Sequence, residues 1–119
     1  MMLTTGQGWR LGYRPGQYPY CALVGGADWA FELTEAEWHD FVAASRSLVQ
    51  AWVAVAPHLM PDEATTLEQS VGSVQLRAEG QPQAYSLYLQ TTSGRRCEGE
   101  WPAAVVPELL QTLLSWSTS

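Results

Sequence analysis

The stretch WAFELTEAEWHDFVAASRSLVQAW, residues 29–52, decides the fold of this chain. It predicts a short strand, Trp29 to Leu33, that is followed directly by a long helix. Thr34 is a good N-cap residue, and Glu37 three positions later completes a capping box. The stretch therefore predicts the point at which a sheet ends and a helix begins.

The predicted helix has one broad apolar face. Apolar residues recur at the spacing of a single helical face, and these are Trp38, Phe41, Val42, Leu48, Val49, Trp52 and Val53. Leu33 before the cap and Trp38 at the fourth helical position form a hydrophobic staple. These signals predict a helix that runs to about Ala56 and packs on a sheet through this face.

Length and charge limit the classes of function. A chain of 119 residues is expected to form one domain, residues 1–119, with a substantial core. It contains no lysine, and its six arginines face twelve acids, so the net charge is −6. Because non-specific binding of nucleic acid needs a basic surface, this balance argues against such binding.

Localisation signals are absent from the sequence. The N-terminal residues lack the basic and apolar segments of a signal peptide, and no apolar run approaches the ~20 residues of a spanning helix. These features predict a soluble, cytoplasmic protein that does not enter a membrane. In that reducing compartment Cys21 and Cys97 are expected to be free and buried, and a disulfide is the alternative interpretation.

Alternating apolar residues and turn signals predict the other elements. The predicted strands are 8–15, 20–24, 29–33, 64–72, 73–79, 83–91 and 95–101, after a weakly paired start at 1–8. Residues predicted to face inward are Trp9, Leu11, Tyr13, Val74, Leu76, Ala78, Tyr85, Leu87 and Leu89. Gly80, Gln81 and Pro82 are predicted to form a turn. Pro102 is expected to open a second helix, whose apolar stripe is Val106, Leu109, Leu110 and Leu113, with Trp116 near its end.

The two halves of the chain, about 1–60 and 61–119, resemble each other. A shift of 68 residues aligns Gly12 with Gly80, Tyr20 with Tyr88, Gly26 with Gly94, Glu32 with Glu100 and Ala36 with Ala104. The same shift places Leu33 on Trp101 and Phe41 on Leu109. Because the matches fall at turns and at a helix start, we expect a pseudo-repeat. The fold class predicted is α+β, with two antiparallel strand–strand–strand(–strand)–helix units.

Three stretches resemble a cyanobacterial family of small proteins of unknown function: GWRLGYRP, ALVGGADWAFELTEAEW and AYSLYLQTTSGRRCEGEWPAAVVPELLQ. That family is similar to the single-stranded-DNA-binding transcriptional regulator fold, which Whirly proteins share with a eukaryotic transcriptional coactivator. The resemblance implies a cyanobacterial origin and a Whirly-like fold. It implies no established activity and no functional residues, and a fold does not by itself define a function.

Arginines on or beside predicted strands are the candidate nucleic-acid-binding residues. They are Arg10, Arg14, Arg77 and Arg96, with Tyr88 as a stacking platform. Arginine beside exposed aromatic rings suits stacking on single-stranded bases. The alternative is that these arginines pair with acids on a solvated sheet face, namely Glu32, Glu79, Glu98 and Glu100. The excess of acids favours the alternative.

Catalytic and metal-binding patterns are missing. His39 and His58 lack further ligands at a suitable spacing for zinc, and His39 follows Glu35 by four residues, as in an ordinary helical pair. Glu98 and Glu100 share a strand face without a nearby nucleophile. Phosphate-loop, nucleophile-elbow and dinucleotide patterns are also absent. We therefore expect no enzyme, no metal and no cofactor.

Two functions from different classes remain. The first is a non-catalytic module that binds single-stranded nucleic acid or acts in transcription, as the fold resemblance implies. The alternative is an acidic protein-interaction or assembly factor. A contiguous arginine patch on the sheet favours the first, and interleaved acids favour the second. Trp52 and Trp116 either pack in the core or form a surface between copies of the chain, so a homo-oligomer is left open.

Overall fold

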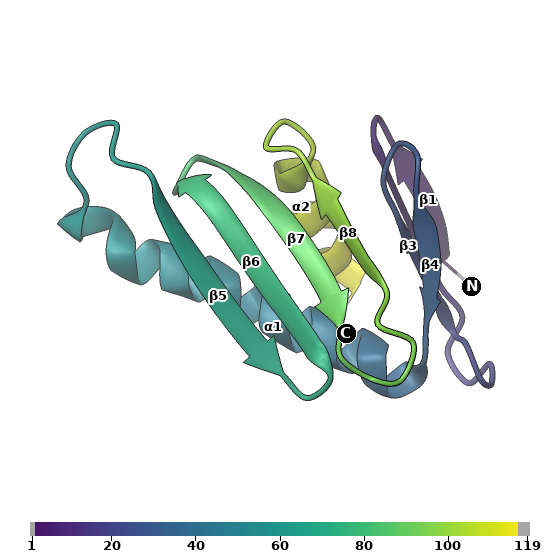
Figure 1. The fold of residues 1–119 in the computed structure, drawn as a ribbon. Coiled ribbons are helices and arrows are strands. Elements are labelled where there is room, and N and C mark those ends of the chain that lie inside the picture. Colours follow the sequence, from purple (N-terminus) through teal and green to yellow (C-terminus); the bar gives the residue numbers. More distant parts are fainter. Residues whose placement is uncertain (1, 117–119) are drawn as a thin grey trace.

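The computed structural model describes residues 2–116, in which two four-stranded antiparallel sheets are combined with two α-helices (Figure 1). The first sheet contains β1 (Met2–Gly6), β2 (Trp9–Tyr13), β3 (Ala22–Gly25) and β4 (Ala30–Leu33). The second contains β5 (Thr65–Val71), β6 (Val74–Gln81), β7 (Ala84–Thr91) and β8 (Glu98–Trp101). Helix α1 (Glu35–Val55) is followed by a 3₁₀ turn, Ala56–His58, and α2 (Val106–Trp116) follows β8. The predicted α+β class is confirmed.

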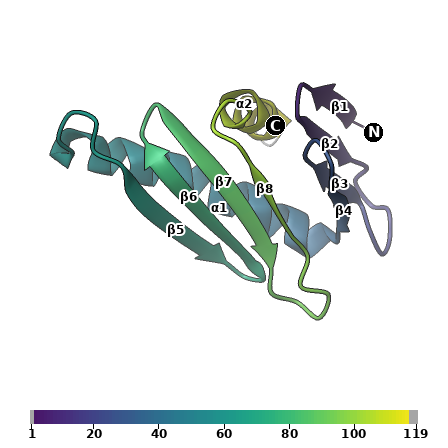
Figure 2. The same ribbon diagram turned by 45° about the horizontal axis from the view of Figure 1, so that its top comes forward.

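The helices cover one face of each sheet and leave the other face to solvent. In both sheets the strand order follows the chain order. Helix α1 packs mainly on β5 and β6, and α2 lies against β2 and β7 between the two sheets (Figure 2). Each sheet therefore has an inner face on the helices and an outer face, and the outer faces are the broad surfaces open to a partner.

The start of α1 is formed as its sequence predicts. The Glu37 amide donates to Thr34 Oγ1 at 3.2 Å, and the Thr34 amide donates to Glu37 Oε1 at 2.8 Å, which completes the capping box. The helix ends at Val55, with Ala56 as its C-cap. One predicted core residue is wrong, because Val53 is 71% exposed. It lies one helical step of 100° beyond Trp52, outside the arc that faces the sheet.

The core joins both sheets and both helices in one apolar cluster. The largest fully buried side chains are Trp101, Phe41, Leu11, Leu33, Leu48, Leu76, Leu87, Leu89, Leu109, Leu113, Val24 and Val74. Trp9, Trp38 and Trp52 are also buried, whereas Trp116 is partly exposed. The inward alternation predicted for β6 and β7 is thus confirmed at Val74, Leu76, Ala78, Leu87 and Leu89. Trp52 belongs to this core rather than to an exposed surface.

Three local predictions need correction. The start of the chain, expected to be weakly paired, forms strand β1, and all five of its residues pair with β2; Met1 lies outside the described residues. Strand β6 continues through Gln81, so the turn is the residue pair 82–83. The last strand begins at Glu98 rather than at Arg95, because residues 92–97 form the loop between β7 and β8.

The second helix begins four residues later than predicted. Pro102 opens a tight turn instead of the helix, closed by a hydrogen bond from the Val105 amide to the Pro102 carbonyl at 2.9 Å. Helix α2 then starts at Val106, with Pro107 in its first turn, where a missing N–H costs no intrahelical bond. The predicted apolar stripe is nevertheless buried.

The pseudo-repeat is present with two different shifts. Ala22 pairs with Leu33 in the first sheet, and Leu87 pairs with Trp101 in the second. From 22 to 87 is 65 residues, whereas from 33 to 101 is 68. The first three strands therefore correspond at 65, and the fourth strand and the helix correspond at 68. The predicted alignment of Gly12 with Gly80 is wrong, since the second half contains three extra residues before β8.

The described helices do not meet the length and apolarity that crossing a membrane requires. Both cysteines are free, as expected; Cys21 is buried and Cys97 is partly exposed.

Candidate binding surfaces

The outer face of β5–β8 brings Arg77 and Tyr88 together. The two residues are register partners on β6 and β7, and the Arg77 guanidinium carbon lies 4.7 Å from the centre of the Tyr88 ring. Arg77 Nε also contacts Glu79 Oε1 at 3.2 Å. The Tyr88 hydroxyl donates to Glu98 Oε2 at 2.8 Å. The stacked pair is therefore held on both sides by carboxylates.

Acids surround this pair on the same face. Glu68 on β5 is opposite Arg77, and Glu100 on β8 is opposite Tyr88. The pKa of Tyr88 is raised, first by burial and then by the hydrogen bond to Glu98. Four carboxylates (Glu68, Glu79, Glu98 and Glu100) thus share the strand positions of this face with one arginine, which makes the face negative.

The remaining candidate arginines lie elsewhere. Arg10 is on β2 of the first sheet and donates from Nη2 to the Trp29 carbonyl at 3.3 Å. Arg14 follows β2 in the same sheet. Arg96 is in the loop between β7 and β8, with φ 52°. Of the five residues predicted to bind nucleic acid, the structure places only Arg77 and Tyr88 in contact, and the role of all five in binding stays a prediction.

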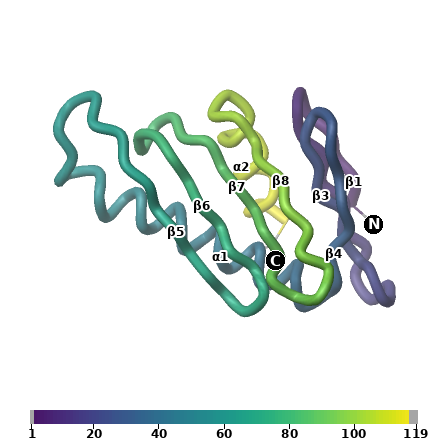
Figure 3. The backbone as a smooth tube through the Cα atoms, viewed as in Figure 1, coloured from purple at the N-terminus to yellow at the C-terminus, as the bar shows by residue number. Residues whose placement is uncertain are grey.

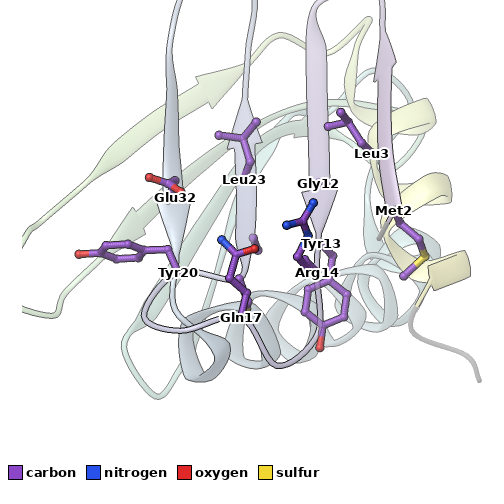
Figure 4. A pocket seen from close by; sticks show the side chains of 11 residues that line it. Met2, Leu3, Gly12, Tyr13, Arg14, Gln17, Tyr20, Leu23 and Glu32 are labelled. Carbon is purple, nitrogen blue, oxygen red and sulfur yellow. The ribbon is translucent and has the colours of Figure 1, made fainter.

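The outer face of the first sheet has a hollow at the corresponding place (Figure 4). At the shift of 65, Gly12 corresponds to Arg77, and Leu23 corresponds to Tyr88. The hollow has a volume of about 250 Å³ and is shallow. Figure 4 shows Arg14, Gln17 and Tyr20 at one end and Leu3 and Leu23 farther along the strands. A Cβ at Gly12 would lie 3.2 Å from Leu3 Cδ1, so the missing side chain keeps this floor open.

Indole rings join the two sheets where β4 and β8 face each other. Trp29 Nε1 donates to the Glu100 carbonyl at 3.2 Å, and Trp101 Nε1 donates to the Gly25 carbonyl at 2.9 Å. The two rings lie 4.9 Å apart, and Trp101 stacks on Phe41. A Cβ at Gly99 would lie 2.4 Å from the Trp29 ring, so glycine is required at that close approach.

A buried carboxylate, Glu37, links the loop between β7 and β8 to the start of α1 (Figure 3). Its Oε1 accepts from Arg95 Nη2 at 3.0 Å, and its Oε2 accepts from the Ser93 hydroxyl at 2.6 Å. Arg95 Nη2 also donates to the Glu32 carbonyl at 2.7 Å, and its guanidinium lies over the Tyr20 ring. Burial acts to raise the pKa of Glu37, but the bonds from Ser93 and Thr34 and the Arg95 charge together lower it.

A second polar cluster surrounds Glu35. Glu35 Oε2 accepts from the Tyr13 hydroxyl at 2.6 Å and contacts His39 Nε2 at 2.9 Å. The Tyr13 bond is the main reason that the pKa of Glu35 is lowered. Burial raises the pKa of Tyr13 to about 12 and that of Cys21 to about 11. Because a thiolate is the reactive form of cysteine, Cys21 is an inert thiol at neutral pH. Residues 2–116 contain no group of three or more His, Cys, Asp or Glu side chains placed to hold a metal.

Arg95, Glu37, Trp29 and Trp101 are the residues whose roles the sequence did not reveal. Glu37 was recognised as part of a capping box, but its contact with Arg95 spans 58 residues. The one sequence signal for the junction was the similarity of the two stretches that end in Leu33 and Trp101.

Comparison with known proteins places the chain in a group without a described function. The family model described as a domain of unknown function, DUF1818, matches residues 4–116. A crystal structure of a protein with unknown function from the DUF155 family of Prochlorococcus sp. NATL2A is 27% identical in sequence. It aligns with a TM-score of 0.89 over 98% of this chain and 99% of the Prochlorococcus chain. No curated protein matches this sequence.

Proposed function

Starting from the fact that this chain belongs to the DUF1818 family, whose description names no function, we propose that it is a non-catalytic module that binds a protein partner. The free thiols of Cys21 and Cys97 suit a reducing compartment, the cytoplasm. The polar clusters support the absence of catalysis, because each carboxylate in them is occupied by structural bonds. Glu35 holds Tyr13 and His39, and Glu37 holds Thr34, Ser93 and Arg95.

The observation that carries this proposal is the charge of the outer face of β5–β8. Arg77 and Tyr88 have the chemistry of a base-stacking platform, but acids alternate with them across every strand of the face. A phosphate backbone approaching this surface would meet the carboxylates of Glu79 and Glu98 beside its two favourable groups. Since like charges repel, the face suits a basic protein surface better than a nucleic acid.

Nucleic-acid binding is the second candidate, and the Whirly-like resemblance is what favours it. Each half is a four-stranded antiparallel unit followed by a helix, which suits that resemblance. On this alternative, Arg77 and Tyr88 would contact single strands locally. The affinity would be weak and would fall steeply with salt, because each phosphate contact releases counterions.

A tagged pull-down from the source cell, with and without nuclease, tests the class of partner. We expect a protein to be retained equally with and without nuclease. Loss of the captured protein after nuclease treatment would instead show that nucleic acid bridges the two. Capture of no protein under either condition would contradict the proposal.

Fluorescence anisotropy with labelled oligothymidine at low salt tests the alternative directly. We expect no binding at about 100 μM protein, near the weak end of non-specific affinities. Salt-sensitive binding that is lost when Arg10 and Arg77 are both replaced by Gln would overturn the protein-partner proposal. Arg46→Gln, on the helix, is the matched control for the loss of positive charge.

A further inference from the structure

Strand β5 offers the longest open edge among the described strands. The edges of β4 and β8 face each other, and the side chains of Trp29, Trp101 and Arg95 occupy carbonyls along that junction. Strand β5 lies at the end of its sheet and has seven residues in unbroken register with β6. The other end strand, β1, has five. Natural edges are usually protected by lysine, proline or a bulge, and β5 has none of these.

The register shows which backbone groups point outward from β5. Residues 72 and 73 form a two-residue turn, so the flanking pair Val71 and Val74 exchange hydrogen bonds. Bonded and non-bonded pairs alternate along an antiparallel ladder. The N–H and C=O groups of Thr66, Glu68 and Ser70 therefore point away from β6. The side chains of the same three residues are exposed on the outer face.

The central residue of this edge carries a charge without a cationic partner. Glu68 is opposite Arg77, but Arg77 pairs with Glu79 and stacks on Tyr88 instead. Within the described residues, the Glu68 carboxylate accepts one long hydrogen bond, from Gln75 Nε2 at 3.4 Å. The negative field of the neighbouring acids adds to this charge, so the edge is complementary to a cation.

The same glutamate disfavours pairing between two copies of the chain. A symmetric antiparallel pair that used all three outward residues would place Glu68 directly opposite its own copy. Like charges directly opposite each other destabilise a strand pair. The position that attracts a basic strand therefore also acts against self-association.

We propose that the β5 edge binds an extended basic segment of a partner protein by antiparallel strand addition. A lysine or arginine of the segment lies opposite Glu68, and backbone bonds form with Thr66, Glu68 and Ser70. The residue opposite Leu67 is apolar, because that half-buried side chain lies on the inner face against the core. This inference rests on the proposed protein-binding function and adds the binding site and the chemistry of the partner.

A designed peptide tests the site without knowledge of the natural partner. The probe is a blocked heptapeptide that alternates Val and Thr around a central Lys, and its matched control has Glu at the centre. We expect NMR shifts in the amides of Thr66, Glu68 and Ser70, with the Lys peptide binding at least about tenfold more tightly. No shift at about 1 mM peptide, or equal binding of both peptides, would overturn the proposal.

Variants of Glu68 separate the edge from the rest of the surface. Glu68→Pro removes an N–H that points outward, so the ladder with β6 loses no bond. It should abolish peptide binding, whereas Leu3→Pro, which blocks the outward edge of β1, should leave it intact. Glu68→Lys should reverse the preference toward the Glu peptide, and this holds as a test even if the proline variant folds poorly. An unchanged preference in Glu68→Lys would contradict the proposed contact.

The pull-down distinguishes failure of this inference from failure of the proposed function. If the wild-type chain retains a protein that Glu68→Pro and Glu68→Lys both lose, the edge is its binding site. If the variants retain that protein as well as the wild type does, the module binds proteins through another surface and the edge proposal is wrong. If the wild type retains no protein, the proposed function fails first.

Discussion

In the first half of the molecule, four residues separate the paired positions Gly25 and Ala30, whereas in the second half seven residues separate Gln90 and Glu98. The three extra residues lie in the loop between β7 and β8, the same loop that supplies Ser93 and Arg95 to Glu37. The shorter loop of the first half sends Trp29 to the Glu100 carbonyl instead. Two similar units have thus acquired different loops, each of which contacts the opposite unit.

Inside the molecule the two halves remain alike. At the shift of 65, buried Leu11 corresponds to buried Leu76, and Val24 corresponds to Leu89. On the outer faces the same shift pairs Gly12 with Arg77 and Leu23 with Tyr88. Packing against the helices has kept both inner faces apolar, while the outer faces differ between an open hollow and a charged pair. The outer faces are therefore where different functions for the two sheets would lie.

The largest effect is expected at the junction of the two halves. Trp101→Ala should lower the free energy of unfolding by about 3–5 kcal/mol. It removes a fully buried ring that stacks on Phe41 and leaves the Gly25 carbonyl without its indole donor. Urea denaturation measures the loss. Val53→Ala, at an exposed position, is the control, and an equally small cost at Trp101 would show that the ring does not hold the halves together.

Glu37→Gln should cost about 1.5–3 kcal/mol, the range for hydrogen bonds to charged groups. The variant keeps the side-chain shape but removes the charge that Arg95 and Ser93 contact. The second half has Val105 at the corresponding position and therefore no such carboxylate. Chemical denaturation of both proteins at pH 7 checks the value, and Glu68→Gln, an exposed site, serves as the control.

The same variant should change the dependence of stability on pH. Because folding lowers the pKa of Glu37, its ionised form contributes stability above the ordinary glutamate value of about 4.3. That contribution is lost as the pH falls below this value and the folded carboxyl gains a proton. Wild-type protein should therefore lose stability more steeply than Glu37→Gln between about pH 5 and pH 3. Parallel curves would show that Glu37 has no lowered pKa.

A smaller effect is expected at the cap of α1, which has no counterpart at α2. Thr34→Ala should cost about 1 kcal/mol, because it removes the acceptor of the Glu37 amide. The corresponding residue in the second half is Pro102, which opens a turn. Thermal melts of Thr34→Ala and of Thr66→Ala, an exposed strand threonine, give the comparison. Equal melting temperatures for the two variants would show that the hydroxyl of Thr34 does not cap the helix.

The smallest effect is expected for the charged pair on the outer face. A double-mutant cycle of Arg77→Ala and Tyr88→Ala should give a coupling of about 0.5–1 kcal/mol, as for an exposed cation–π contact. The corresponding residues of the first sheet, Gly12 and Leu23, contain no such pair. A coupling of several kcal/mol would mean that this face stabilises the fold and is not a surface free for binding.

Local signals in the sequence were enough to predict α1 and most of the inner faces. The capping box, the apolar stripe and the alternation in β6 and β7 each involve residues within a few positions of one another. The start of α2 was predicted wrongly because both Pro102 and Pro107 suit the first turn of a helix, and only the structure shows which one takes it. Strand β1 was missed because its stability comes from pairing with β2 rather than from its own threonines.

The junction and the binding surfaces could not be predicted in the same way. Trp101 meets the Gly25 carbonyl across 76 residues, and Arg95 meets Glu37 across 58. No local pattern specifies such contacts. The candidate arginines were grouped because they lie on strands, but strand position does not reveal which sheet a residue belongs to. The structure separates Arg10 and Arg14 from Arg77 for this reason.

The exchange of helices between the halves has a consequence for how such a chain could arise. Helix α1 belongs to the first half but packs mainly on β5 and β6, and α2 belongs to the second half yet lies against β2. A half on its own would expose an apolar sheet and hold its helix away from it. An ancestor that encoded a single unit would have gained a closed core by pairing with its own copy, each lending a helix to the other. Gene duplication and fusion would then have turned that dimer into one chain and freed the two units to diverge.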